Sequence, residues 1–291
     1  MSFSLFNILS IHELSMSFEL GLIYGITAIG IYFSFRVIDF PDMTCDGSFV
    51  LGAAASTVLI QAGYPPLFAL LLAMCASAAA GLATGLLHTK LKITTLLSGI
   101  LVAFMLYSIN LKVLGGVPNI TLMKQTTLFT GHDPLLVLLI LVTIVAFGSA
   151  YLLMTDFGLA LRSLGQNKVL AQYSGIRVPT LTLIALMLSN SLIGLSGALF
   201  SQYQGFVDVS QGIGTLITGL AAVMIGERLC SQQKPWRMIL FCLIGSILYR
   251  IFVALALHSE FLGLETQDLN LITGLLVIAV MVLPYQRSKL C

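Results

Sequence analysis

GSFVLGAAASTVLIQAGYPPLFALLLAMCASAAAGLATGLLHT, the stretch from residue 47 to residue 89, contains no Asp, Glu, Lys or Arg. A helix needs about 20 mostly apolar residues to cross the hydrocarbon core of a bilayer, so this stretch is long enough for two crossings. The run Gly63-Tyr-Pro-Pro66 interrupts it in the middle, where proline cannot continue a helix and glycine favours a turn. The stretch therefore predicts two transmembrane helices, residues 47–62 and 66–88, joined by a tight turn.

The composition of the whole chain agrees with a lipid environment. Of its 291 residues, 58% are hydrophobic and only 9% are charged, whereas soluble domains carry about 25% charged residues. The net charge of +2 is too small to predict a nucleic-acid partner. Apolar runs recur at 17–35, 47–62, 66–88, 93–111, 134–155, 179–201, 209–226, 236–257 and 270–284. These runs predict an all-α polytopic membrane protein with about nine transmembrane helices (eight to ten).

One transmembrane domain is predicted for residues 17–284, between an N-terminal lead-in of residues 1–16 and a tail of residues 285–291. The five cysteines are irregularly spaced and form no CxxC motif, so neither a disulfide framework nor a metal site is predicted. The chain has no Gly-Lys dipeptide and hence no P-loop. No Ser/His/Asp or Cys/His set is recognisable, so we expect neither catalytic residues nor a cofactor.

The distribution of positive charge predicts the orientation in the membrane. If the nine spans alternate, ten Lys and Arg residues fall on one side: Lys90, Lys92, Arg162, Lys168, Arg177, Arg228, Lys234, Arg237, Arg287 and Lys289. The opposite loops 202–208 and 258–269 carry acidic residues and no Lys or Arg. Because short cytoplasmic loops are enriched in Lys and Arg, we expect the ten residues and the C-terminus to be cytoplasmic.

Two polar breaks predict an internal repeat. Residues 39–54 and 208–222 each begin with Asp, pass through Gly, and enter a Gly/Ala-rich span. On the predicted topology these two spans run in opposite directions, which is typical of an inverted repeat of spans 1–4 and 6–9 and marks a translocation path. Chance similarity of two Gly/Ala-rich spans remains open. The motifs Gly21-x-x-x-Gly25 and Gly81-x-x-x-Gly85 predict close helix crossings.

Ionisable and amide side chains near membrane depth are costly and therefore candidates for function. Asp39, Asp42 and Asp46 form either a carboxylate cluster or an ordinary turn in which Asp46 caps the second span, the reading we favour. Arg250 lies within the eighth span and either reaches the outer interface, as we expect, or pairs with an acidic residue, namely Asp208, Glu260 or Asp268. The candidate residues for a translocation pathway are Asp39, Asp42, Asp46, Asn110, Asn190, Asp208, Gly212 and Gly214.

The basic loop at residues 156–178 has the punctuation of short helices. Gly165 is expected to end one helix, Asn167 to cap the next at its N-terminus, and Gly175 to close it in a left-handed conformation. Val169 and its neighbours Leu170 and Tyr173 then share one face. The loop is either an amphipathic linker on lipid headgroups or a surface that meets a partner.

Several motifs in this chain resemble the permease subunits of bacterial ABC importers. The basic loop, Arg162-x-x-Gly-Gln-Asn-x-x-x-Ala-x-x-Ser-Gly-Ile176, is similar to the coupling loop of the branched-chain amino-acid and ribose permease superfamily. A subgroup of amino-acid, tryptophan-type permeases is the nearest likeness, through Phe40-Pro-Asp-Met-Thr-Cys-Asp-Gly-Ser-Phe49, His88-Thr-Lys-Leu-Lys92, Tyr107-Ser-Ile-Asn-Leu111, Gln202-Tyr-Gln-Gly-Phe206 and Gly226-Glu227. Two positions depart from it: Asp39 stands where Asn is expected, and Cys45 where an aliphatic residue is expected.

This resemblance implies an assembly in the bacterial plasma (inner) membrane. Two copies of the permease would form the pathway, a separate cytoplasmic ABC ATPase would dock on the coupling loops, and an extracytoplasmic substrate-binding protein would deliver a small metabolite, expected to be an amino acid. The residues that would couple to the ATPase are Gly165, Gln166, Asn167, Val169, Leu170, Ala171, Tyr173, Ser174, Gly175 and Ile176. Two alternatives are an ion-coupled secondary transporter that uses Asp39, Asp42 and Asp46, and a membrane scaffold.

Overall fold

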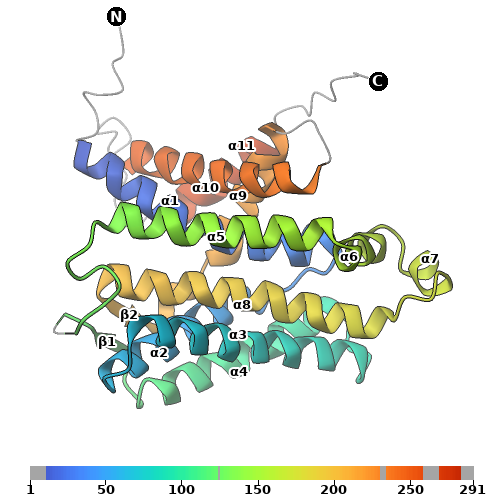
Figure 1. Ribbon diagram of the computed structural model, residues 1–291, viewed down its shortest axis with the longest axis horizontal. Helices are drawn as coiled ribbons and strands as arrows, with labels where there is room; N and C mark the ends of the chain where they lie inside the picture. Colours follow the sequence, from blue (N-terminus) through green and yellow to red (C-terminus); the bar gives the residue numbers. More distant parts are fainter. Residues whose placement is uncertain (1–10, 124, 230–233, 258–268, 283–291) are drawn as a thin grey trace, which may run out of the picture.

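The computed structural model describes residues 11–123, 125–229, 234–257 and 269–282, which are almost entirely helical (Figure 1). The helices are α1 (Ile11–Ile31), α2 (Cys45–Gln61), α3 (Pro66–Thr89), α4 (Thr95–Val113), α5 (Pro134–Met154), α6 (Asp156–Gln166), α7 (Lys168–Tyr173), α8 (Val178–Gln204), α9 (Thr215–Leu229), α10 (Pro235–Leu257) and α11 (Leu269–Val282). A π-helical turn, η2 (Tyr32–Val37), extends α1, and a 3-10 turn, η3 (Val209–Gly212), precedes α9.

The prediction of an all-α polytopic membrane protein is confirmed. Seven helical segments of the described chain are long and apolar enough to cross a membrane, while α2, with 17 residues, is shorter. Each of the nine predicted runs contains a helix, although α11 has only 14 residues, so the number of crossings stays a prediction. The first helix begins at Ile11, earlier than the predicted first span.

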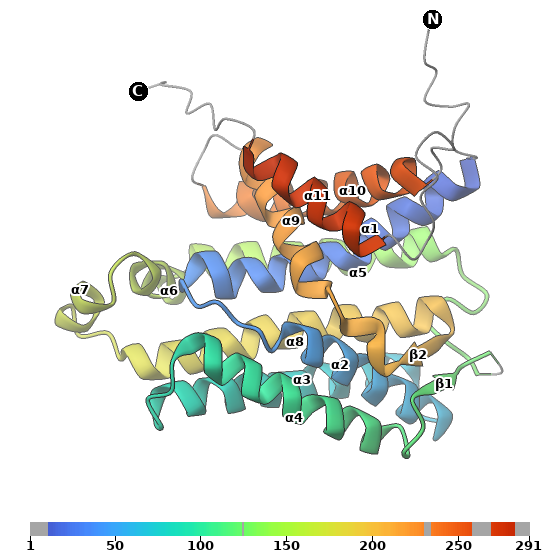
Figure 2. The ribbon, with the colours of Figure 1, turned by 180° about the vertical axis from the view of Figure 1, so that it is seen from behind.

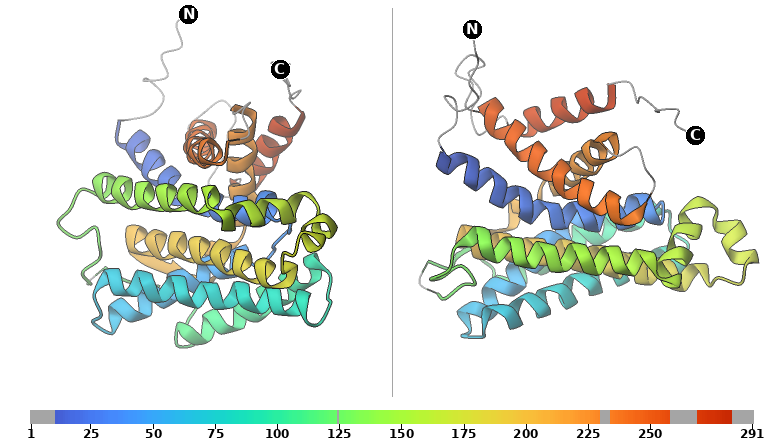
Figure 3. Two further views of the ribbon diagram at one scale, coloured as in Figure 1. Left: turned by 45° about the vertical axis from the view of Figure 1, so that its right-hand side comes forward. Right: turned by 45° about the horizontal axis from the view of Figure 1, so that its top comes forward.

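The long helices lie side by side and give the molecule two distinct ends. Figures 1 and 2 place α6, α7 and the α3–α4 connection at one end, and the β1–β2 ribbon at the other. In Figure 3 the α6–α7 pair projects beyond the ends of the apolar helices. The α7 end therefore carries several of the Lys and Arg residues that were predicted to be cytoplasmic, namely those of the α3–α4 connection and of the α6–α7 loop.

A short antiparallel ribbon of β1 (Asn119–Thr121) and β2 (Phe206–Asp208) was not predicted. In its register Asn119 lies opposite Asp208 and Thr121 opposite Phe206. The ribbon joins the connections that precede α5 and follow α8. If the nine predicted spans alternate, both connections lie on the same side of the membrane, and their pairing agrees with that topology.

Glycines allow the helices to pack at close distance, as the Gly-x-x-x-Gly motifs predicted. A Cβ atom at Gly81 of α3 would lie 2.3 Å from the carbonyl oxygen of Leu186 on α8. A Cβ atom at Gly21 of α1 would lie 2.8 Å from the Cα atom of Ile247 on α10. In lipid the hydrophobic effect does not drive helices together. Close backbone approach at small residues instead stabilises their association through van der Waals packing.

Two helices start in the interior and do not cross the whole molecule. After η2 the chain returns through residues 38–44 to α2, and after β2 it returns through η3 to α9. Figure 2 shows α9 beginning near the middle of the molecule, beside α2. The two polar breaks that sequence analysis singled out are therefore brought together in space.

Candidate functional site

Asp46 joins the two breaks. Its carboxylate accepts hydrogen bonds from the backbone N–H of Leu216 (2.8 Å), the hydroxyl of Thr215 (2.8 Å) and the N–H of Gly214 (3.3 Å). The expectation that Asp46 caps its own helix is wrong, because α2 is N-capped at Thr44 without a side-chain bond. Asp46 lies inside the first turn of α2, so its side chain reaches across to the free N–H groups at the start of α9.

The backbone at the second break depends on glycine. A Cβ atom at Gly212 would lie 2.2 Å from the carbonyl oxygen of Asp46, so a larger residue would push the two breaks apart. Gly214 has a φ of +87°, a left-handed conformation that L-residues with a side chain rarely adopt. These two glycines, both predicted pathway residues, let η3 turn into α9 against α2.

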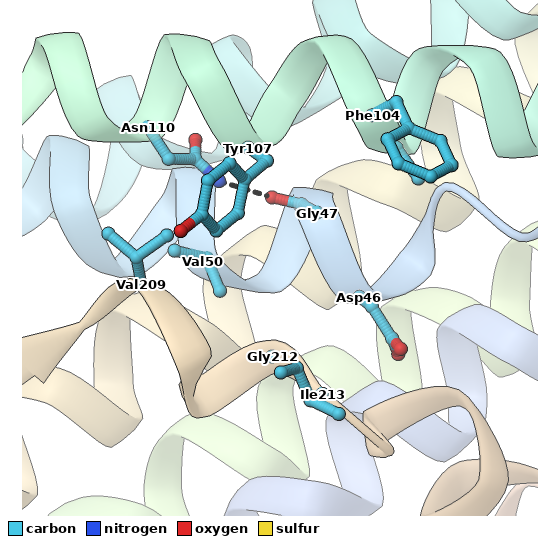
Figure 4. A pocket seen from close by; sticks show the side chains of 10 residues that line it. Asp46, Gly47, Val50, Phe104, Tyr107, Asn110, Val209, Gly212 and Ile213 are labelled. Carbon is cyan, nitrogen blue, oxygen red and sulfur yellow. Dashed lines mark hydrogen bonds between the residues drawn. The ribbon is translucent and has the colours of Figure 1, made fainter. Parts of the chain in front are cut away.

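A cavity of about 520 Å³ opens on one side of Asp46, between α2, α4 and η3 (Figure 4). We name it the α4 cavity; it is lined by Asp46, Gly47, Val50, Ala103, Phe104, Tyr107, Asn110, Val209, Gly212 and Ile213. The amide of Asn110 donates to the carbonyl oxygen of Gly47 (3.1 Å), while its own buried Oδ1 atom has no hydrogen-bond partner. Apart from Asp46 and Asn110 the walls are mostly apolar.

A second cavity, of about 540 Å³, lies on the other side of Asp46. We name it the Arg250 cavity; it is lined by Leu20, Tyr24, Asp46, Phe200, Gln204, Ile213, Gly214, Ile217, Thr218, Tyr249, Arg250, Thr273 and Gly274. The guanidinium carbon of Arg250 lies 3.9 Å from the centroid of the Tyr24 ring. Asp46 and Ile213 belong to both cavities and so form the partition between them.

One of the three predicted acidic partners of Arg250 is ruled out. Arg250 faces the Arg250 cavity and stacks on Tyr24, and it forms no ion pair with Asp208, which caps η3 by accepting from the N–H of Ser210 (2.7 Å). The other two proposed partners, Glu260 and Asp268, lie outside the described residues. A cation over an aromatic face is stabilised without a counter-ion.

Asp42 and Asn190 form a buried network instead of lining either cavity. The Asn190 amide donates to Asp42 (2.7 Å), and Asn190 Oδ1 accepts from the Ser48 hydroxyl (2.6 Å). Asp42 also accepts from the Thr44 N–H (2.9 Å). Both side chains are fully buried, so this network ties the first break to α8.

The three aspartates of the first break do not come together. Asp39 is exposed and has a φ of +50°, a conformation that Asn and Asp tolerate better than other side chains. Asp42 bonds to α8 and Asp46 to α9. Within the described parts of the chain, no three His, Cys, Asp or Glu residues lie close enough to hold a metal ion.

At the α7 end, the local structure of the basic loop agrees with the capping predictions. Asn167 Oδ1 accepts from the N–H groups of Val169 and Leu170, both at 3.0 Å. Gly175 has a φ of +83°, and the N–H of Ile176 donates to the carbonyl oxygen of Ala171 (3.1 Å). This pattern is a Schellman motif, which satisfies the last carbonyl groups of a helix. The six-residue α7 is therefore capped at both ends.

The outer face of α7 is apolar and exposed. Val169, Leu170 and Tyr173 expose 62%, 64% and 87% of their surface, while Ala171 faces inward and is buried. The neighbouring residues Gln166 and Ser174 are also exposed. Three adjacent exposed apolar side chains on a projecting element are typical of an interaction surface.

Gly165 does not end α6, which continues to Gln166. A Cβ atom at Gly165 would lie 2.1 Å from the carbonyl oxygen of Val37, so this glycine instead lets α6 pack directly on the end of η2. The buried side chains of Leu161 and Leu164 belong to the same apolar core as Val37 and Ile38. The basic loop is thus in contact with the segment that leads into the first break.

Most residues of the Arg250 cavity were not predicted from the sequence. Tyr24, Phe200, Gln204, Thr218 and Tyr249 belong to four different helices, and no spacing pattern links them. The ion pair between Arg36 on η2 and Glu227 on α9 was not predicted either; it joins the ends of the first and seventh predicted spans. The only feature of the sequence that could have indicated some of these residues is a polar side chain within an apolar run.

Asp46→Ala is expected to lower the free energy of unfolding by about 2–3 kcal/mol, because two backbone N–H groups and one hydroxyl lose their acceptor. The matched control is Asp133→Ala, which removes a single exposed cap bond to Leu135 at the start of α5 and should cost about 1 kcal/mol or less. Unfolding of the purified variants in mixed detergent micelles measures both. Equal losses for the two variants would contradict the bridging role of Asp46.

Comparison with known proteins identifies one family and two relatives. The family described as "Branched-chain amino acid transport system / permease component" matches residues 14–283. The "Tyrosine transport system permease protein" of Clostridioides difficile (strain R20291) is 39% identical over 260 residues, which cover 89% of this chain and 87% of the relative. An uncharacterised protein of Rickettsia prowazekii (strain Madrid E) is 33% identical over 266 residues, covering 89% and 93%. No solved structure matches this chain.

Proposed function

Because the chain belongs to the permease component family of branched-chain amino acid transport systems, we propose that it is the membrane-spanning subunit of an ATP-driven importer of amino acids. The seven apolar helices of spanning length within the described residues support a multi-pass protein. A relative of 39% identity is named as a tyrosine transport permease, which supports an amino acid as the substrate class.

The observation that carries the proposal is the exposed apolar face of α7. Val169, Leu170 and Tyr173 present it at one end of the molecule, on a helix capped at both ends. The sequence has no P-loop, so in an ATP-driven importer the ATPase would be a separate chain. An ATPase subunit that packs on this face of α7 would supply the energy for import, with Gln166, Ser174 and Ile176 at its edge.

The proposed orientation follows from the charge distribution. The α7 end and the C-terminus are cytoplasmic, the β1–β2 end faces outward, and the membrane is the bacterial plasma (inner) membrane. The substrate-binding protein would deliver its ligand at the β1–β2 end. Two copies of the chain would form one importer, as the family resemblance implies.

The contact between α6 and η2 suggests how ATPase movement would reach the pathway. A displacement of α7 would pass to α6, which packs through Gly165 against Val37. From there it would pass along residues 38–44 to Asp46, which divides the α4 cavity from the Arg250 cavity. Alternating access would then consist of opening one cavity while closing the other, with Asn110 and Gly212 in the wall of the α4 cavity and Gly214 in the wall of the Arg250 cavity. Asp42, Asn190 and Asp208 would support the breaks on either side.

The test is uptake into proteoliposomes that contain the permease, its ATPase and its binding protein. We expect radiolabelled L-tyrosine to be transported only when ATP is present on the side of the membrane that carries the ATPase. This transport should persist in the presence of a protonophore. Uptake that collapses with the protonophore and continues without ATP would refute the proposal in favour of ion-coupled transport. The separation of Asp39, Asp42 and Asp46 leaves that alternative without a carboxylate cluster.

A further inference from the structure

The Arg250 cavity contains two opposite charges that are not neutralised by each other. Asp46 of α2 and Arg250 of α10 both line it, yet they form no ion pair in the described structure. Charged groups at membrane depth are costly and normally pair or face a functional cavity. The Nε atom of Arg250 is moreover buried without a hydrogen-bond partner. Such an arrangement calls for a ligand that carries both complementary charges.

Each charged side chain is held in place and keeps bonding capacity toward the cavity. Stacking on Tyr24 fixes the plane of the Arg250 guanidinium, but leaves its in-plane N–H groups as donors. The start of α9 fixes the Asp46 carboxylate: one oxygen accepts from Thr215 and Leu216, while the other accepts only a 3.3 Å bond from Gly214. Because an ionised carboxylate has about four acceptor sites, this second oxygen can accept a further donor.

The size and walls of the cavity define the rest of the ligand. A volume of about 540 Å³ lies within the range of small-molecule sites, about 300–1,000 Å³. Three aromatic rings, those of Tyr24, Phe200 and Tyr249, contribute to the walls, and Gln204 and Thr218 add neutral polar groups. A small molecule with a carboxylate, an ammonium group and an apolar or aromatic side chain matches these walls.

We propose that the Arg250 cavity is the binding site for the zwitterionic head of an α-amino acid in the membrane. Arg250 binds the α-carboxylate, Asp46 binds the α-ammonium group, and the aromatic walls contact the side chain. This inference rests on the proposed function, because it names the groups by which the importer recognises its substrate class during passage. A neutral sugar or a nucleobase would leave both charges unmatched.

The experiment measures equilibrium binding to the full-length permease with its ATPase in lipid nanodiscs, without the binding protein. The probes are L-tyrosine, tyramine, which lacks the carboxylate, and 3-(4-hydroxyphenyl)propionate, which lacks the ammonium group. We expect L-tyrosine to bind about tenfold or more tightly than either analogue, since each charge-assisted hydrogen bond is lost separately. Arg250→Gln should weaken L-tyrosine binding by about tenfold and leave tyramine binding unchanged. Removal of an exposed positive charge at the end of α4, Lys112→Gln, is the matched control and should change neither.

Three results would overturn the inference: equal affinity of the wild-type protein for the three probes, absence of L-tyrosine binding, or unchanged L-tyrosine binding by Arg250→Gln. The wild-type comparison remains decisive if the variant does not fold. Import is tested separately with the complete transporter. ATP-dependent uptake of L-tyrosine together with equal probe affinities would refute only the Arg250 site, whereas absence of ATP-dependent amino-acid uptake would refute the proposed function.

Discussion

Leu170→Asp is expected to abolish ATP hydrolysis stimulated by the loaded binding protein while leaving the permease folded. Leu170 exposes 64% of its surface at the centre of the apolar face of α7, so the folded chain loses little when it is replaced. In the complex, the new carboxylate would be buried against the ATPase without a partner. An unpaired buried charge costs about 3–5 kcal/mol, which corresponds to roughly a 100-fold or greater loss of affinity.

The matched control for this prediction lies on the same short helix. Gln172 is exposed and lies two residues from Leu170, about 200° around the helix, so Gln172→Asp introduces the same charge at the edge of the apolar face, beside Val169 and not at its centre. Co-purification of the ATPase and ATPase activity in nanodiscs are measured for both variants. Loss of activity in Gln172→Asp alone, or normal stimulation in Leu170→Asp, would show that the apolar face of α7 is not the coupling surface.

Gly52→Leu is expected to prevent folding of the permease. Gly52 of α2 packs against Gly194 of α8, and a Cβ atom there would lie 2.0 Å from the Gly194 carbonyl oxygen. The obstacle is backbone, so no side-chain rotation can relieve it, and α2 must move away from α8. That movement would also withdraw Asp46 from the start of α9. Since overpacking of a side-chain core alone costs about 1–3 kcal/mol, and whole proteins have only about 5–15 kcal/mol of stability, a clash with backbone should exceed what the fold tolerates.

Gly148 of α5 provides the control. It is exposed and no atom lies within 4 Å of a Cβ atom built on it, so Gly148→Leu should fold as well as the wild type. Size-exclusion chromatography of detergent extracts measures the monodisperse fraction of each variant. A monodisperse Gly52→Leu protein with an unchanged unfolding temperature would contradict the close α2–α8 contact.

The local parts of this structure could be predicted from the sequence because their causes are local. Transmembrane helices follow from apolar length, which explains why the uncharged stretch 47–89 led to the fold class. The caps of α7 follow from Asn167 and Gly175, whose bonds reach only two to five residues along the chain. Even there, Gly165 was misread as a helix end, because its contact with Val37 lies outside the local sequence.

The functional site depended on contacts between distant segments, which only the tertiary structure decided. Asp46 was a plausible cap for its own helix, yet its partners lie at Gly214 to Leu216, about 170 residues away in sequence. Asp208 was a plausible acidic partner for Arg250, yet Arg250 stacks on Tyr24 of the first helix and does not pair with Asp208. In both cases the position of a residue within an apolar run indicates its depth in the membrane but not the helix that it faces. The rotation of each helix about its own axis is set by packing against its neighbours. Hydropathy and capping therefore determined the membrane class and the local structure of the basic loop, while helix packing decided that Asp46 and Arg250 share one cavity.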